Sequence, residues 1–161
     1  MKNLLKFFAI SICVLTLTAC SDSYNDSNNN SQSVTSFIAT INGANEVPTT
    51  NSTATGKAIA SFNTTTKILT ITVTHTLELA AAGHIHVAEE GANGPVVFPF
   101  SNAVSPMVYT SIALTPLQEA DLLANRYYVN LHSEAFPSGE IRGQLIKGAT
   151  SGGNTGGSGG Y

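Results

Sequence analysis

Three of the four histidines stand where their side chains could meet on one metal ion. His84 and His86 are separated by one residue in an expected strand, so both rings leave the same face, about 6.6 Å apart along the chain. His132 ends another expected strand, whose alternation puts it on one face with Tyr128 and Asn130. Neutral imidazoles in such an arrangement suit copper or zinc. The sequence therefore predicts a metal site of His84, His86 and His132, with copper favoured over zinc.

The same histidines have a plainer interpretation, in which hydrogen bonds from the rings only pin neighbouring loops. A His-x-His pair by itself is a weak motif. His75 follows the apolar face of its own expected strand, and we interpret it as a hydrogen-bonded core or edge histidine because a single ring carries no ligand spacing. Glu89 and Glu90 precede Gly91 in an expected loop, where we expect solvated charges and not acid or base groups.

Glu140 and Arg142 are two residues apart on one face of an expected strand. We expect them to pair with each other or to fix a neighbouring loop. In a functional interpretation, Arg142 lies beside the histidine cluster and attracts an anion. No Ser-His-Asp order, phosphate-binding glycine loop or catalytic carboxylate pair stands out, so the sequence assigns no catalytic residue.

The composition argues against a nucleic-acid-binding protein. Charged residues make up 11% of the 161 residues, against about 25% in a typical protein. Lysine and arginine together number 7, and the net charge is −3, whereas a phosphate backbone needs clustered positive charge. The hydrophobic content of 42% is enough for the core of one domain.

The first 19 residues have the pattern of a secretion signal. Lys2 and Lys6 form a basic start, residues 7–18 an apolar run, and Leu17-Thr18-Ala19-Cys20 a small-residue cleavage site. The apolar run is shorter than the about 20 residues that a membrane-spanning helix needs. We therefore expect residues 1–19 to be removed during export.

The cysteine that follows resembles the acylated cysteine of a bacterial lipobox. The sequence has two cysteines, Cys13 within the signal and Cys20 at its end, so no disulfide is expected in the mature chain. The resemblance implies a lipid anchor at Cys20 and an exported, membrane-anchored lipoprotein, periplasmic or on the cell surface, with the outer membrane favoured where the organism has one. The alternative is an ordinary signal peptide with an incidental cysteine.

Composition divides the rest of the chain. Residues 20–34 are dominated by Ser, Asn and Asp and predict a disordered tether. Residues 148–161 are rich in glycine and predict a disordered tail. The folded domain is therefore expected over residues 35–147.

Short runs of alternating apolar and β-branched residues recur through this domain, between Gly, Asn and Pro punctuation. The expected strands are residues 36–41, 57–62, 67–77, 84–87, 96–100, 107–112, 127–132 and 140–146. Only residues 115–124 predict a helix, since Thr115, Pro116 and Gln118 form a helix start with a capping box. The expected fold is all-β, an antiparallel β-sandwich of about eight strands with one short helix.

Five motifs occur in the order found in the CHRD (chordin) domain. They are Asn45-Glu46-Val47-Pro48, Gly83-His84-Ile85-His86, Gly91-Ala92-Asn93-Gly94-Pro95-Val96-Val97, Tyr127-Tyr128-Val129-Asn130-Leu131-His132 and Gly139-Glu140-Ile141-Arg142-Gly143-Gln144-Leu145. The resemblance covers about residues 37–146; Thr49 departs from it, since the family often has a second proline there. It implies a β-sandwich module of secreted bacterial proteins and of animal chordin, an extracellular antagonist of growth factors, and no settled activity for the bacterial members.

A fainter resemblance concerns copper, zinc superoxide dismutase, an Ig-like sandwich. His84, His86, His132 and Arg142 follow the order of that family's His-x-His strand, later ligand histidine and C-terminal arginine. Between His86 and Phe100 no histidine or aspartate supplies the bridging or zinc ligands, and the family's disulfide is impossible. The resemblance therefore implies a copper-only or purely metal-binding site and not a two-metal dismutase.

The expected function is a cell-envelope lipoprotein with one CHRD domain that binds a transition metal. One alternative is a non-catalytic adhesion or scaffold module that binds an envelope protein or glycan. The other is a copper-only enzyme similar to superoxide dismutase, with Arg142 drawing in the anion.

Overall fold

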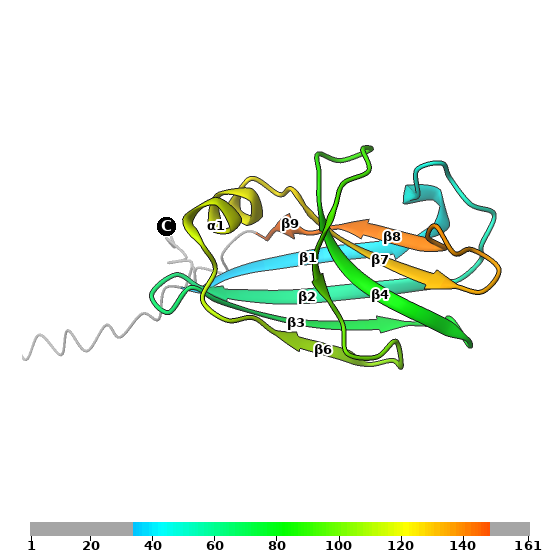
Figure 1. Cartoon of the computed structure of the whole chain (residues 1–161), viewed down its shortest axis with the longest axis horizontal. Helices are drawn as coiled ribbons and strands as arrows, with labels where there is room; N and C mark the ends of the chain where they lie inside the picture. Colours follow the sequence, from blue (N-terminus) through cyan, green and yellow to red (C-terminus); the bar gives the residue numbers. More distant parts are fainter. Residues whose placement is uncertain (1–33, 149–161) are drawn as a thin grey trace, which may run out of the picture. The chain divides into compact units, whose positions relative to one another are not determined.

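The computed structural model describes residues 34–148, and antiparallel strands dominate them (Figure 1). The strands are β1 (Val34–Asn42), β2 (Thr55–Asn63), β3 (Ile68–His75), β4 (Ala80–Val87), β5 (Val96–Pro99), β6 (Met107–Thr110), β7 (Tyr127–Ser133), β8 (Ile141–Gln144) and β9 (Ile146–Lys147). A 3-10 turn, η1 (Gly43–Asn45), follows β1, and one helix, α1 (Pro116–Leu123), lies between β6 and β7.

Each long strand turns one row of side chains into the core. In β3, Leu69, Ile71 and Val73 are fully buried, while Thr72 and Thr74, which alternate with them, are exposed. This period of two is the pattern of a strand with one dry face. The strands β1 and β2 repeat it, so the burial of alternate apolar residues explains why these segments pair as a sheet.

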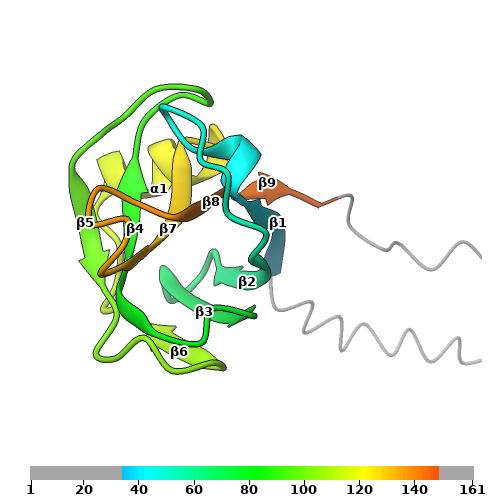
Figure 2. The ribbon, with the colours of Figure 1, turned by 90° about the vertical axis from the view of Figure 1, so that its right-hand side faces the viewer.

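The strands form one hydrogen-bonded sheet that curls until its two halves face each other. The order along the sheet is β5-β4-β7-β8-β1-β2-β3-β6, with β9 also paired to β1. The end-on view shows the ribbon turning from β5 through β8 and β1 to β6 around the interior (Figure 2). The result is a sandwich-like fold whose apolar core lies between the halves.

Hydrogen bonds join the two halves of the sheet along one side, and aromatic side chains meet on the other. On the first side, β8 touches β1 through the pair Arg142 and Asn42, and β9 continues along β1. On the second side, Phe98 of β5 stacks on Tyr109 of β6 with ring centroids 5.3 Å apart, although these two edge strands are not neighbours in the sheet. The core is thus enclosed on both sides.

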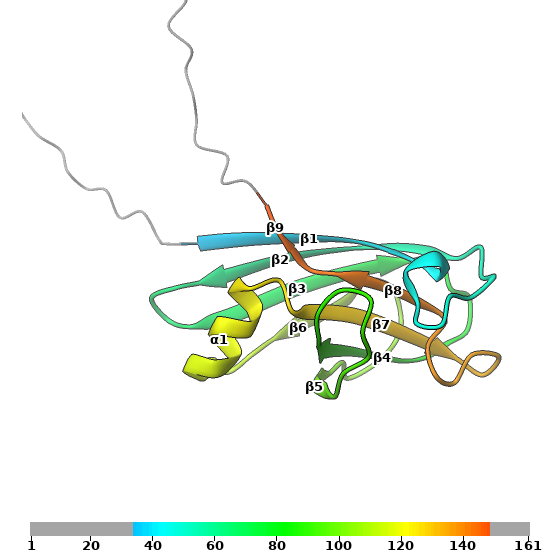
Figure 3. The same cartoon turned by 90° about the horizontal axis from the view of Figure 1, so that it is seen from above.

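The helix α1 lies at one end of the sheet (Figure 3). Thr115 accepts a hydrogen bond from the Gln118 backbone N–H, and the Gln118 side chain accepts one from the Thr115 backbone N–H. Pro116 occupies the first turn, where its missing N–H costs nothing. Leu122 is fully buried and anchors the helix to the core.

These elements confirm an all-β antiparallel fold with one short helix. Residues 34–148 contain nine strands, because the predicted strand 140–146 breaks into β8 and β9. Leu145 at the break is fully buried, and its backbone N–H still bonds to Tyr127 of β7, whereas Ile146 pairs with Ile38 of β1. After Leu145 the chain therefore leaves β7 and continues along β1.

Other predicted boundaries differ from the observed ones by up to four residues. The strand predicted at 67–77 ends at His75, so Leu77 lies beyond it. The strand predicted at 84–87 begins four residues earlier, at Ala80, in a run of alanines with weak strand propensity that pairs with β7 all the same.

Several predictions fall on residues that the structure does not describe. These are the signal at 1–19, the lipidated Cys20, the tether except for Val34, and the tail after Gly148. Within residues 34–148, the structure contains no helix that is long and apolar enough to cross a membrane.

Candidate metal centre

The three histidines of the predicted metal site come together on neighbouring strands. β4 supplies His84 and His86, and β7, which pairs with β4, supplies His132. Each offers a ring nitrogen within 4.8 Å of the nitrogens of the other two. His84 Nδ1 and His132 Nε2 lie 3.0 Å apart. The structure thus brings together all three residues that the sequence predicts as ligands.

Backbone carbonyls orient two of the rings. Nδ1 of His86 lies 2.9 Å from the carbonyl oxygen of Gly94, and Nδ1 of His132 lies 3.0 Å from that of Pro137. A carbonyl can only accept, so each Nδ1 carries the proton and each Nε2 keeps its lone pair. Metal-binding histidines are commonly oriented in this way. His86 Nε2 is buried and has no hydrogen-bond partner among the described residues.

The spacing and chemistry of these nitrogens fit a transition metal ion. Two nitrogens bound at about 2.0–2.1 Å in tetrahedral geometry are about 3.3 Å apart. The 3.0 Å between His84 Nδ1 and His132 Nε2 is close to that value. His86 Nε2, a buried acceptor without a donor, completes a set of three imidazole nitrogens. Such a set suits copper or zinc.

The surroundings of the rings favour their neutral form. Burial, followed by the neighbouring His132 and His86, lowers the pKa of His84 below its usual range. Burial also lowers the pKa of His86, with further contributions from His132 and Arg142, while the Gly94 carbonyl partly offsets them. Neutral imidazole is the form that binds metal, so less proton competition opposes metal binding here.

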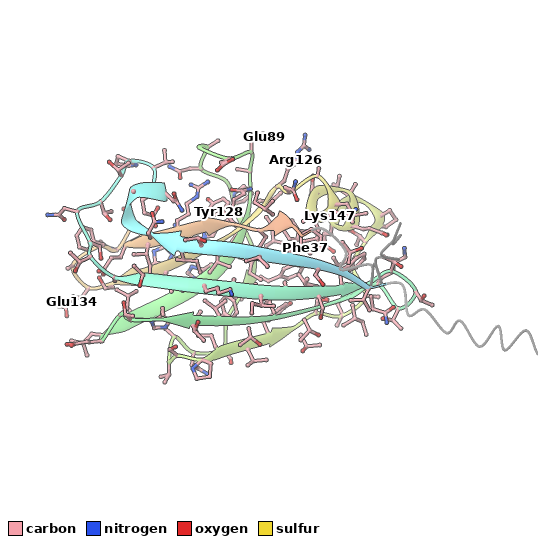
Figure 4. All side chains as sticks on the ribbon, turned by 180° about the vertical axis from the view of Figure 1, so that it is seen from behind. Phe37, Glu89, Arg126, Tyr128, Glu134 and Lys147 are labelled. Carbon is pink, nitrogen blue, oxygen red and sulfur yellow. The ribbon has the colours of Figure 1, made fainter. Side chains whose placement is uncertain are left out.

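A stack of three side chains runs across the strands beneath the site. The rings of His86 and Tyr128 are stacked, with centroids 4.9 Å apart and planes at 12°. The guanidinium carbon of Arg142 lies 3.5 Å from the centroid of the same Tyr128 ring. Because β7 lies between β4 and β8, Tyr128 stands between His86 and Arg142. Tyr128 is almost fully buried, and Figure 4 labels it within the fold.

Arg142 holds the loop that supports His86. It donates from Nη1 to Asn93 Oδ1 at 3.0 Å and from Nη2 to the Ala92 carbonyl at 2.6 Å. The next residue, Gly94, supplies the carbonyl for His86, and its N–H donates to the hydroxyl of Tyr128 at 3.1 Å. Of the two structural expectations for Arg142, the structure shows the loop contact and no ion pair with Glu140 among the described residues.

A buried carboxyl group lies next to this stack. Glu46 is 4% exposed, and its Oε1 has no hydrogen-bond partner among the described residues; the same holds for Asn130 Oδ1. Burial raises the pKa of Glu46 to about 6, although the Val47 backbone N–H and Arg142 act in the opposite direction. Gly139, at a φ of +133°, packs so closely that a Cβ there would lie 2.7 Å from both Glu46 Oε1 and Asn130 Oδ1.

The other candidate residues lie apart from the metal centre. Nε2 of His75 lies 3.0 Å from the Ala103 carbonyl, so His75 is hydrogen-bonded as expected, although its strand β3 is an inner strand of the sheet and not an edge. Glu140 accepts hydrogen bonds from Ser52 and Ser133. Glu89 is exposed and pairs with Arg126 at 2.7 Å, and Figure 4 shows the two side by side at the rim; Glu90 is also exposed.

Sequence reasoning missed several groups that support the site. Glu46 belongs to the Asn-Glu-Val-Pro motif. The proline of this motif indicates a fixed turn, but nothing in the motif indicates that the acid is buried. The carbonyls of Gly94 and Pro137 are invisible to side-chain patterns, since every residue has a carbonyl group. Only the pairing of β4 with β7 and the fold of the loops brings them to the rings.

The comparisons with known proteins agree with the motifs. A family model for the CHRD domain matches residues 37–145, which include both strands that carry the histidines. No curated protein and no solved structure matches the chain. The chain belongs to the CHRD domain family.

Proposed function

We propose that the CHRD domain of this protein binds one transition metal ion through His84, His86 and His132. The observation that carries this proposal is the convergence of three imidazole nitrogens within 4.8 Å of one another. It gains support from the two backbone carbonyls that orient His86 and His132, and from the buried, unpartnered Nε2 of His86.

Copper is the favoured metal. All donors are imidazole nitrogens, and imidazole is a donor that suits copper. The ligand rings are half-buried, so the site is dry enough to strengthen electrostatic interactions while an added ligand could still reach the ion. Zinc is the second choice, because three imidazoles are also a common zinc donor set.

Metal content of the purified full chain tests this proposal. We expect one copper per wild-type chain after loading and removal of free metal, and a loss of most of it in His84→Ala and in His132→Ala. His75→Ala is the matched control, since His75 is also a part-buried strand histidine, and its ring nitrogen bonds to the Ala103 carbonyl instead of facing the other histidines. Sub-stoichiometric copper in the wild type, or equal copper in all four proteins, would overturn the proposal.

We further propose that this domain works outside the cytoplasm, anchored by a lipid at Cys20. The support is the signal-like sequence of residues 1–19 and the cysteine after Leu-Thr-Ala. The membrane is then a partner through the acyl chains. Incorporation of labelled fatty acid into the wild type and not into Cys20→Ala is the expected result; equal labelling of both would contradict it.

A scaffold role is the second candidate, and one surface favours it. A row of five side chains crosses neighbouring strands, and each residue of the row is paired with the next. In order across the sheet, the row consists of Ile146, Ile38, Ile59, Thr72 and Val108. They face outward, and the four aliphatic ones are each 45–58% exposed. Such a row suits contact with an envelope protein or glycan. The test is retention of the protein on a cell-envelope fraction. If Ile59→Lys abolishes retention while His84→Ala leaves it intact, the scaffold role stands without the metal. If His84→Ala abolishes retention while Ile59→Lys leaves it intact, a metal-independent scaffold role is excluded.

A dismutase activity has no specific support. The role of Arg142 as an attractant for an anion needs a cation that faces the entering ion. Arg142 is 2% exposed, and its two terminal nitrogens donate to Asn93 and Ala92. We therefore propose metal binding without assigning catalysis.

A further inference from the structure

The donor set of the metal centre contains no negative charge. Within residues 34–148, the cluster of groups able to share one ion consists of histidines alone. The carboxylate of Glu140 in the neighbouring loop is engaged by Ser52 and Ser133. A bound ion therefore keeps its full charge, which is one unit for monovalent copper and two for divalent copper.

A buried positive charge lies close to this donor set. Arg142 is 2% exposed and forms no ion pair within the described part of the chain. Its guanidinium carbon is 3.5 Å from the centre of the Tyr128 ring, and the His86 ring lies 4.9 Å from that centre on the neighbouring strand. One aromatic ring is thus all that separates the guanidinium from a metal ligand.

Charges separated by buried side chains act on each other more strongly than charges in water. The repulsion between Arg142 and the ion scales with the charge of the ion, so a divalent ion is disfavoured twice as strongly as a monovalent one. Glu46 lies near enough to Arg142 to be affected by its charge, and its carboxylate offsets part of the repulsion without forming an ion pair.

The coordination that three histidines offer acts in the same direction. Three nitrogens are enough for monovalent copper, whereas divalent copper prefers a tetragonal set with further nitrogen or oxygen ligands. The described chain places no carboxylate among the ligand atoms to complete such a set.

We propose that Arg142 makes the three-histidine site selective for monovalent over divalent copper. This inference rests on the proposed function, since a site without copper has nothing to select. It gives the Arg142, Tyr128 and His86 stack a role besides packing.

Separate affinities for the two oxidation states of copper test this inference. In the full chain, the Kd for monovalent copper is measured without oxygen against bicinchoninate, and the Kd for divalent copper against nitrilotriacetate. We expect Arg142→Gln to shift the ratio of the two Kd values about tenfold towards divalent copper, which corresponds to a reduction potential about 59 mV lower. Arg142→Lys keeps the charge but loses the paired donors, so both affinities can fall while their ratio stays that of the wild type.

A second variant tests the same charge without removing the arginine. Asn93 Oδ1 accepts from Arg142 at 3.0 Å, so Asn93→Asp places a carboxylate against the guanidinium with little change in shape. We expect Asn93→Asp to shift the ratio of the two Kd values in the same direction as Arg142→Gln. The inference can therefore still be tested if Arg142→Gln does not fold.

Three results are distinguishable. If the ratio of the two Kd values in Asn93→Asp and Arg142→Gln equals that of the wild type, the proposed selectivity is overturned. It is also overturned if Arg142→Lys shifts the ratio as far as Arg142→Gln does, because Arg142 would then act only by holding the loop. Absence of copper of either charge from the wild type would instead overturn the proposed function. A charge-dependent ratio supports both.

Discussion

At the scale of single residues, the metal centre depends on which imidazole nitrogen carries a proton. The Gly94 and Pro137 carbonyls hold that proton on Nδ1 of His86 and His132, which leaves both Nε2 atoms for an ion. Without an ion, the 3.0 Å contact between His84 Nδ1 and His132 Nε2 is a hydrogen bond with Nδ1 as donor. Metal binding through His84 Nδ1 would therefore require this proton to move to Nε2 of the same ring, while His86 and His132 keep their protons on Nδ1.

The stability of the domain depends on pH through the carboxyl group of Glu46. Burial raises its pKa from 4.5 to about 6, so the folded state favours the protonated form. Its contribution to stability is complete below pH 4.5 and is lost as pH rises through about 6. A shift of this size corresponds to about 2 kcal/mol. We expect the wild type to lose about that much unfolding free energy between pH 4 and pH 7, relative to Glu46→Gln.

Denaturant unfolding of both proteins at the two pH values measures this difference. Glu46→Gln is a suitable reference because its amide has nearly the shape of the protonated acid and does not titrate in this range. Parallel pH dependence in the two proteins would show that Glu46 is not the group responsible.

At the scale of elements, two loops turn a pair of strands into a site. The loop after β4 supplies the Gly94 carbonyl and is held by Arg142 of β8. The loop after β7 supplies the Pro137 carbonyl and ends at Gly139. The strands fix the spacing of the rings, and the loops fix their orientation.

Gly139→Ala tests how tightly the second loop is fitted. The backbone at Gly139 has a φ of +133°, and an added Cβ would lie 2.7 Å from atoms of Asn130 and Glu46. We expect a loss of roughly 2–4 kcal/mol in unfolding free energy and weaker copper binding, because Pro137 moves with the loop. Gly91→Ala is the matched control: its φ is +78°, but nothing lies within 4 Å of an added Cβ. It should cost about 1 kcal/mol; equal costs in the two variants would contradict this account of Gly139.

The strands that carry the ligands could be predicted, because alternation is a local property of the sequence. His84, His86 and His132 stood on recognisable strands, and their meeting required only that β4 and β7 be neighbours. The burial of Arg142 could not be predicted in this way. On β8 it belongs to the outward face, and only the covering loop after β4 makes that face an interior.

At the scale of the whole domain, a single sheet has to enclose a core. Hydrogen bonds join its halves through β8, β9 and β1, while the opposite edges, β5 and β6, meet through rings. The break at Leu145 and the stack of Phe98 on Tyr109 follow from this curl. Local patterns indicated the strands but not the curl, which depends on pairing between residues far apart in the sequence.

Phe98→Ala tests the side of the fold on which the edge strands β5 and β6 meet through aromatic rings. Phe98 is 8% exposed and contacts both Tyr109 and Tyr127, with ring centroids at 5.3 and 6.0 Å. We expect a loss of about 3–4 kcal/mol in unfolding free energy. Val96→Ala in the same strand, at a site 47% exposed, should cost less than about 1 kcal/mol. Chemical denaturation of the two variants decides, and a mild effect of Phe98→Ala would mean that the edges of the sheet are held by something else.

The central claim is that three imidazole rings from two strands share one ion. X-ray absorption fine structure of the copper-loaded full chain tests it most directly, because the spectrum counts the nitrogen ligands and shows the outer atoms of each ring. We predict three imidazole nitrogens at about 2.0 Å from the copper. A spectrum with fewer than three imidazoles would contradict the shared site.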